Sequence, residues 1–220
     1  MLNNLLNLWE LIFPSLLETL YMVLFSTLFS VILGFILGII LVITDKGHIW
    51  EKPHLNKVLG SIINVARSVP FIILIIAIFP LSRLIVGTTI GSTASIVPLS
   101  IAAAPFVARV IEASLKEVNW GVIEASISVG ATIPQIIFKV MIPEALPSLI
   151  LGITLTVINI LGYSAMAGAI GGGGLGDLAI RYGYQRFQTE VLIATIVVLV
   201  VLVEFIQIVG NLLAKKFNKR

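Results

Sequence analysis

Five long apolar stretches alternate with short polar segments along the chain. A helix needs about 20 apolar residues to cross the roughly 30 Å of hydrocarbon in a bilayer, and each stretch is close to that length. The predicted spans are residues 19–44, 58–79, 94–111, 146–167 and 191–213. Pro14 and Ser15 are predicted to begin the first helix. The pattern therefore predicts an all-α polytopic membrane protein with five transmembrane helices.

Glycine, proline and charged residues inside these stretches refine the prediction. Gly34 and Gly38 have the GxxxG spacing that lets two helices approach closely, and plain packing is the favoured reading. Pro70 is accommodated within the second span, and Arg67 is expected to extend back toward the loop side. The third span contains two prolines and is predicted to be kinked. Residues 168–188 are predicted to form an outer loop, either re-entrant or outside the membrane.

The distribution of Lys and Arg predicts the orientation. If residues 45–57, residues 109–147 and the C-terminus share one side, and Arg67 is counted with them, that side holds 11 of the 14 basic residues. The other side holds only Arg83, Arg181 and Arg186. Because basic residues accumulate on the cytoplasmic side, we expect the N-terminus outside and the C-terminus in the cytoplasm.

Composition agrees with a membrane protein and narrows the chemistry. The chain is 58% hydrophobic and 11% charged, whereas soluble domains carry about 25% charge. Cysteine is absent, which excludes a disulfide framework and a thiolate metal site. His48 and His54, both in one short loop, offer too few ligands for a zinc site. We expect no metal or cofactor in this chain, and no nucleic-acid partner, because topology accounts for the positive charge.

Residues 109–147 are the longest region in which polar and turn-forming residues interrupt the apolar sequence. Glu112 and Lys116, four residues apart, can pair on a solvated helix face. The predicted helices are residues 109–117, 122–129 and 134–142, the last two ended by Gly130 and Pro143. This region is predicted to lie across the cytoplasmic membrane face, either as a docking surface or as an ordinary surface loop.

Energy-converting motifs are absent from the sequence. There is no GxxxxGK[ST] phosphate loop, no HExxH and no serine elbow, so we predict that the chain is not an enzyme. Uphill transport would then need energy from another chain. The alternative is an ion-coupled secondary transporter or channel for a small amino acid, with Glu204 as its proton or cation site. The absence of a convincing internal repeat weighs against that alternative.

Several motifs resemble a known family. The segment EAS at residues 124–126, Gly130 and Ile142-Pro143 resemble the EAA motif of ABC importer permeases, with Ser in place of the second Ala. The stretches ARSVPFIILI, IVGTTIGSTASIVPL, AAAPFVAR, EALPSLI and GYSAMAGAIGGGGLG resemble the permeases of methionine ABC importers. This similarity extends from about residue 15 to about residue 210, and the five-span count also fits.

The resemblance implies an assembly and a mechanism. Residues 1–220 would be one permease domain in the bacterial inner membrane, with residues 110–145 as its cytoplasmic coupling region. Such permeases form homodimers with two cytoplasmic ATPase subunits, which bind ATP and Mg²⁺, and with an external substrate-binding protein or lipoprotein. Alternating access driven by ATP hydrolysis would import methionine, both L- and D-. The implied ATPase contacts are Glu124, Ala125, Ser126, Gly130, Ala131 and Pro143.

Two further groups of residues are implied for the path of the substrate. The expected pathway residues are Asn159, Tyr163, Ser164 and Met166. A thioether repacks easily and suits a methionine path, although a single Met is also compatible with plain helix packing. The glycines expected to form a tight turn at the outer mouth, near the binding-protein dock, are Gly168, Gly171, Gly172, Gly173 and Gly174.

Overall fold

The computed structural model describes residues 2–218, and every element within that range is a helix. The elements are α1 (Leu2–Ile43), α2 (Pro53–Ser68), α3 (Phe71–Val86), α4 (Ser92–Lys116), α5 (Trp120–Ser128), α6 (Ile133–Ile136), the π-helix η1 (Ile137–Met141), α7 (Ile142–Gly168), α8 (Gly174–Leu178), the π-helix η2 (Ala179–Tyr184) and α9 (Thr189–Phe217). The predicted all-α fold class is confirmed.

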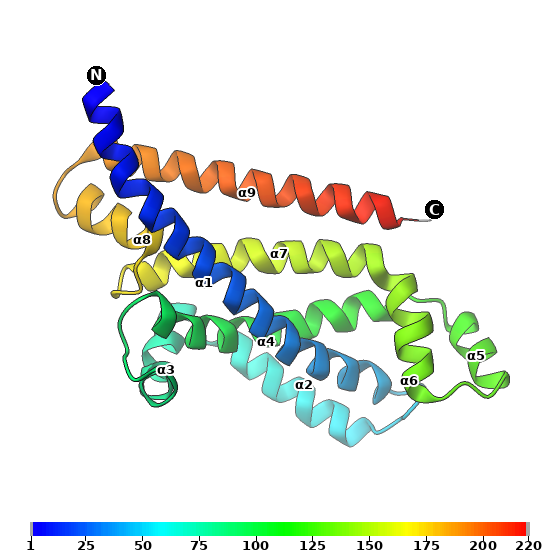
Figure 1. Cartoon of the computed structure of the whole chain (residues 1–220). Coiled ribbons are helices and arrows are strands. Elements are labelled where there is room, and N and C mark those ends of the chain that lie inside the picture. The colour runs from blue at the N-terminus through cyan, green and yellow to red at the C-terminus, as the bar shows by residue number, and fades with distance from the viewer. Residues whose placement is uncertain (1, 219–220) are drawn as a thin grey trace.

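The long helices form an elongated bundle with two different ends (Figure 1). α1 crosses α4 along much of its length, and α7 lies between α4 and α9. One end, called here the loop end, contains residues 44–52 and α5. The other, called here the glycine end, contains residues 171–174 and α3. The first turns of α1 and the last turns of α9 lie at opposite ends of the bundle.

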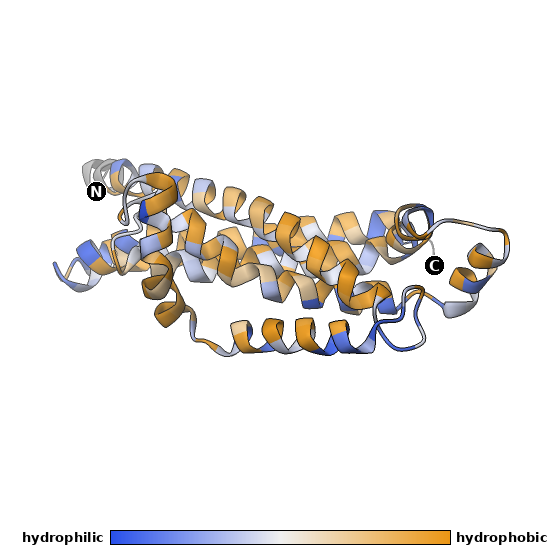
Figure 2. Cartoon of the chain, turned by 90° about the horizontal axis from the view of Figure 1, so that it is seen from below, coloured by the Kyte–Doolittle hydropathy of each residue, from blue (hydrophilic) through white to orange (hydrophobic). Residues whose placement is uncertain are grey.

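Within the described residues, four helices are long and apolar enough to cross a membrane: residues 8–43, 92–116, 133–168 and 189–217. α2 and α3 make a fifth span only if the pair is counted together, because the two are bent by 106°. Figure 2 shows apolar residues along the length of the bundle and hydrophilic residues concentrated toward its ends. A helical protein with several membrane spans is therefore confirmed.

The second span differs from its prediction as one straight helix. α2 ends at Ser68, Val69 is extended (φ −78°, ψ 124°), and Pro70 (φ −57°, ψ 136°) precedes α3. The cause is local, because the residue before a proline is disfavoured in the α conformation and proline donates no backbone hydrogen bond. Predicting an uninterrupted helix through Pro70 was wrong.

Other helix boundaries also differ from the sequence prediction. Pro14 lies inside α1 rather than at its start. Pro143 lies in the first turn of α7, which directly follows the π-helix η1, and does not close a helix there. α6, η1 and α7 consequently form one continuous 36-residue helix, Ile133–Gly168. The predicted outer loop, residues 168–188, contains α8 and η2, which pack against α1, α7 and α9.

Glycine permits the close crossing of α1 and α4. A Cβ atom at Gly34 would lie 2.5 Å from the Cβ atom of Val107, and one at Gly38 would lie 2.8 Å from that of Ile111. Both distances are shorter than any side-chain contact allows, so the GxxxG spacing predicted to mediate packing does so within this chain. Val107 and Ile111 also belong to the buried cluster at the loop end.

Candidate functional site

The segment between α4 and α7 has the local geometry that the sequence predicts. The Asn119 side chain accepts a hydrogen bond from the Gly121 amide at 2.8 Å and caps α5. Gly130 follows α5 with φ +79°, a left-handed conformation that favours glycine. The Thr132 amide donates to the Gln135 side chain at 2.8 Å, which fixes the start of α6. These caps hold a short helix outside the main bundle at the loop end (Figure 1).

The residues expected to contact an ATPase lie together on this segment. Glu124, Ala125, Gly130 and Pro143 are exposed, whereas Ser126 and Ala131 are half-buried. Sequence reasoning missed the apolar side chains around them. The large apolar side chains exposed in this region are Trp120, Val122, Ile127, Val129 and Phe138, with Val129 83% exposed. Clusters of exposed apolar residues are typical of interaction surfaces. The sequence signal for this cluster is that apolar residues recur at helical spacing in a segment with few polar residues.

One side chain anchors α5 to the rest of the protein. Ile123 is 1% exposed and is the only buried residue of this nine-residue helix. It belongs to an apolar cluster with Val118 of the α4–α5 connection and with Ile136 and Met141 of the helix that continues into α7. An isolated helix shorter than about 12 residues is marginal in water, so the position of α5 depends on this contact.

A chain of alternating charges, called here the charge ladder, runs along α4 to the loop between α1 and α2. Glu112 accepts from Arg109 at 2.6 Å and from Lys116 at 2.8 Å, and Lys116 also pairs with Asp45 at 2.6 Å. The predicted Glu112–Lys116 pair is confirmed, but Glu112 is only 8% exposed, so it does not lie on a solvated face. Arg109 additionally donates to the Asn64 side chain of α2 at 2.9 Å. The ladder therefore connects α4 to α2 and to the loop between α1 and α2.

The loop also touches α5 through an aromatic contact. The His48 ring packs edge-on against Trp120, with ring centroids 5.3 Å apart. The Nδ1 atom of His48 is buried, and no hydrogen-bond partner for it exists among the described residues. Burial lowers the pKa of His48, against the opposing effect of the nearby Asp45 charge. The hydrogen bond from Lys116 lowers the pKa of Asp45.

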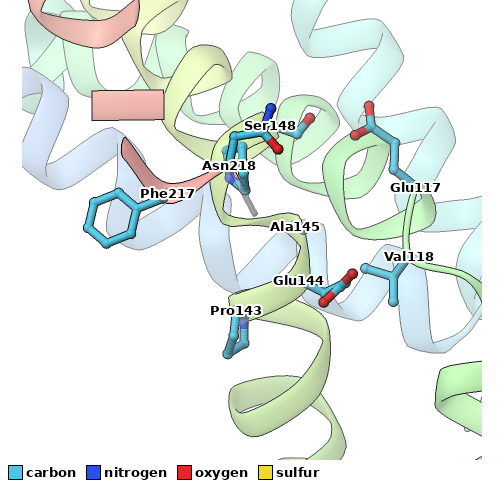
Figure 3. Close-up of a pocket in the computed structure, with 9 residues that line it drawn as sticks. Glu117, Val118, Pro143, Glu144, Ala145, Ser148, Phe217 and Asn218 are labelled. Atoms are coloured by element: carbon cyan, nitrogen blue, oxygen red, sulfur yellow. The ribbon is translucent and has the colours of Figure 1, made fainter. Parts of the chain in front are cut away.

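A hollow of about 230 Å³ lies beside this surface (Figure 3). Its walls come from the end of α4, the first turns of α7 and the end of α9. Glu117 and Glu144 provide carboxylates, and Ser148 and Phe217 also line the hollow. Pro143, one of the predicted coupling residues, borders it.

The predicted pathway residues do not all lie on one surface. Asn159 and Met166 are exposed on one side of α7, and Met166 is 49% exposed. With Leu151, Leu155 and Gly162 they form an exposed strip, called here the α7 strip, because the residues recur at helical spacing. The remaining two predicted residues lie next to this strip. Tyr163 is half-buried, while Ser164 is buried and donates to the Leu161 carbonyl at 2.7 Å.

The predicted glycine turn is tightly held against its neighbours. Gly171, Gly173 and Gly174 have positive φ of 90°, 78° and 76°. The Gly174 amide donates to a Glu18 carboxylate oxygen of α1 at 2.7 Å, and a Cβ atom at Gly168 would lie 2.4 Å from the Asp177 amide nitrogen. Gly172, between them, is buried. The backbone therefore turns tightly at these glycines. The hydrogen bond from Gly174 to Glu18 of α1 had no signal in the sequence, because the two residues are 156 positions apart.

A small cavity lies at the bend between α2 and α3. It has a volume of about 140 Å³ and is lined by residues of α2, α3, α4 and α7, among them Arg67, Phe71, Phe106 and Tyr163. The Phe71 and Tyr163 rings stack with centroids 4.5 Å apart and an interplanar angle of 9°. The Arg67 guanidinium carbon lies 5.9 Å from the centre of the Phe106 ring, rather than extending toward the loop side as the sequence suggested.

A bundle of long apolar helices, with a short capped helix at one end, defines an integral membrane protein. The chain belongs to the family of binding-protein-dependent transport system inner membrane components, whose sequence profile matches residues 30–220. The resemblance stated from the motifs is therefore confirmed at the level of the family.

Individual relatives cover nearly the whole chain. The probable D-methionine transport system permease protein MetI of Vibrio cholerae is 49% identical over 96% of this chain and 94% of its own. The methionine import system permease protein MetP of Bacillus subtilis is 49% identical over 99% of this chain and 96% of its own.

Solved structures agree with these relatives. A chain of the inward-facing MetNI methionine ABC transporter is 43% identical, covers 96% of this chain and 97% of its own, and superposes with a TM-score of 0.94. A chain from a crystal structure of an amino acid ABC transporter with histidines has a TM-score of 0.78 at 22% identity and 97% coverage of both chains, which shows likeness of fold alone.

Proposed function

We propose that this chain is the permease subunit of an ABC importer that moves methionine, in both its L- and D-forms, into the cell. The observation that carries the proposal is the 49% identity, over 99% of this chain, to a methionine import system permease protein. The match to a solved methionine ABC transporter, with a TM-score of 0.94, supports it. The chain itself performs no catalysis and binds no cofactor, because ATP and Mg²⁺ are bound by a separate ATPase subunit.

The working assembly contains two copies of this chain, two ATPase subunits and an external substrate-binding protein or lipoprotein, within the lipid of the bacterial inner membrane. The loop end faces the cytoplasm and the glycine end faces outward, with the N-terminus outside and the C-terminus inside. The concentration of Lys and Arg in the segments of the loop end supports this orientation. The α7 strip supports a dimer, because Asn159 on a membrane-spanning helix needs a polar neighbour that lipid does not offer.

The surface around α5 is the proposed contact with the ATPase. Glu124, Ala125 and Gly130 are exposed there beside the apolar Val129. When ATP draws the two ATPase subunits together, α5 moves with them. Ile123 transmits this movement into the helix that continues as α7. The same movement reaches the charge ladder through the contact between Trp120 and His48. The pore then opens alternately to the outside and to the cytoplasm.

The substrate passes along the α7 strip. Asn159 and Met166 provide its surface, Tyr163 borders it, and the buried Ser164 supports it from behind. The glycine turn at residues 168–174 forms part of the outer mouth, where the binding protein delivers its ligand. A polarisable thioether at Met166 adapts to the side chain of a passing methionine.

Substitution of Gly130 by tryptophan tests the docking surface. Gly130 has φ +79° and no atom near the position of a Cβ, so an indole there would stand out from the surface. We expect Gly130→Trp to insert in the membrane normally but to lose copurification with the ATPase and uptake of radiolabelled methionine in proteoliposomes. Gly47→Trp is the matched control, because Gly47 also has a positive φ (+75°) and open space around it. Normal ATPase binding by Gly130→Trp would refute the docking assignment.

The substrate assignment has its own test. Proteoliposomes containing this chain with its ATPase and binding protein should accumulate L- and D-methionine only when ATP is present. Uptake that persists without ATP would favour the ion-coupled alternative. If ATP drives no methionine uptake although the ATPase is bound and active, the assignment of methionine as the substrate is wrong.

A further inference from the structure

Arg67 is a cation far from either end of the bundle. It lies 14 residues beyond Pro53, the first residue of α2, which is about 21 Å along a helix that rises 1.5 Å per residue. Just beyond it, the break at Val69 and Pro70 turns the chain through 106°. Its neighbour Phe106 lies near the middle of α4. A charge at such depth is costly and marks a functional position by default.

Arg67 has no anionic partner within the described chain. None of the ion pairs among residues 2–218 includes it, in contrast to Arg109 and Arg181, which both pair with carboxylates. The Arg67 guanidinium lies over the face of the Phe106 ring. The guanidinium also lines the cavity of about 140 Å³ described above. Arg67 is exposed on the surface of this single chain, and an unpaired guanidinium that borders such a cavity is positioned to bind an anion.

Most of the other side chains that line the cavity are apolar, and two of them are aromatic rings held by stacking. Phe71 and Tyr163 are held by their parallel stacking. The other lining residues besides Arg67 are Ala66, Val69, Leu74, Ala102 and Phe106. The volume is well below the roughly 300–1,000 Å³ of a pocket for a drug-sized ligand. Such a space accommodates a carboxylate and the few carbon atoms next to it. Tyr163 follows Gly162 of the α7 strip, so the rest of a ligand would extend onto that strip.

We propose that the Arg67 cavity is a subsite inside the membrane for the α-carboxylate of the transported amino acid. A guanidinium presents parallel N–H donors that match the two oxygens of a carboxylate. The aliphatic part of the ligand packs on Leu74 and Phe106, and its side chain reaches the α7 strip near Met166. This inference rests on the proposed function and adds to it a recognition step within the permease.

A second unpaired charge offers the competing explanation. Glu204 is exposed on α9, and no ion pair among the described residues includes it. α2 and α9 lie on opposite sides of the bundle, with α4 and α7 between them (Figure 1), so Arg67 and Glu204 of one chain do not meet. In a dimer, however, Arg67 of one copy could neutralise Glu204 of the other. The experiment has to separate these two roles.

Uptake by the complete transporter in proteoliposomes separates them. Variants Arg67→Lys and Arg67→Met are compared with Arg83→Met, a control at an exposed arginine of α3. Uptake of radiolabelled methionine is expressed per permease–ATPase complex recovered, so that poor assembly does not count as poor transport. We expect Arg67→Met to lose about tenfold to a hundredfold, the range for losing hydrogen bonds to a charged group. Arg67→Lys should recover part of this loss, and Arg83→Met should transport like the wild type.

Two results would overturn the subsite. One is uptake by Arg67→Met within about twofold of the wild type, well below the tenfold change that a lost charged hydrogen bond implies. The other is that adding Glu204→Gln to Arg67→Met restores methionine uptake, which would mean that Arg67 neutralises Glu204 across the dimer. The proposed function fails separately, because in that case the wild-type transporter itself moves no methionine.

Discussion

Ile123→Ala should detach α5 from the bundle while leaving the membrane helices intact. Ile123 is 1% exposed and is the only buried side chain of α5, so the helix has no second anchor in the core. Truncation of a buried isoleucine to alanine costs about 2–5 kcal/mol, which includes both the lost burial and the cavity left behind. Since 1.4 kcal/mol corresponds to a tenfold change in an equilibrium constant, the open state of α5 should become about 30-fold to several thousand-fold more populated.

Hydrogen–deuterium exchange of the assembled protein in nanodiscs measures this opening. Amides of α5 should exchange faster in Ile123→Ala by at least about 30-fold, the lower end of the cavity cost, while amides of α4 and α7 keep their rates. Ile127→Ala is the matched control in the same helix, because Ile127 is 43% exposed and its truncation leaves no cavity. Exchange in α5 that changes less than about threefold, or equally in both variants, would refute the anchoring role of Ile123.

Three further predictions follow from other contacts. Burial lowers the pKa of His48 below its ordinary value of 6.5. As the pH falls through 6.5, the unfolded state therefore binds more protons than the folded state, and the folded state loses stability. Between about pH 7.5 and 5.5, the melting temperature of His48→Gln should fall less than that of the wild type. Gly168→Ala places a Cβ 2.4 Å from a backbone nitrogen and should destabilise by about 1–3 kcal/mol in thermal unfolding, whereas Gly162→Ala, with open space around its Cβ position, should not. Glu204→Gln should keep ATP-dependent methionine uptake; ATP-independent uptake that this substitution abolishes would instead establish the ion-coupled alternative.

The sequence predicted the spans well and their breaks poorly. Four of the five apolar stretches correspond to long helices, because hydrophobic length alone distinguishes a spanning segment from a loop. Residues 71–79 after Pro70 are all apolar, whereas the residues before it include Asn64 and Arg67, and neither composition indicates a 106° bend. The conformational restriction of Val69, the residue before the proline, was the available signal.

The candidate site was predictable where it rests on local chemistry. The cap at Asn119 and the left-handed Gly130 are properties of a few adjacent residues, and the EAA-like motif identified the exposed segment between them. Contacts between distant segments were not predictable in this way. The contact of His48 with Trp120 and the hydrogen bond of Gly174 to Glu18 involve residues far apart in the sequence, and no spacing rule connects them.

The continuous helix from Ile133 to Gly168 gives the two ends of the protein a mechanical connection. It begins beside α5 at the loop end, where Ile136 and Met141 pack on Ile123, and it ends where the Gly168 backbone meets Asp177 at the glycine end. The segment is helical throughout, but it turns between α6 and α7 at the π-helix η1 and Pro143 (Figure 1), so displacement passes through this turn rather than along one straight axis. The break at Pro70 is different, since α2 and α3 are joined there only by an extended dipeptide. Displacement of α5 should therefore reach the glycine end through α7, while the Arg67 cavity beside the break changes shape as α7 carries Tyr163 past it.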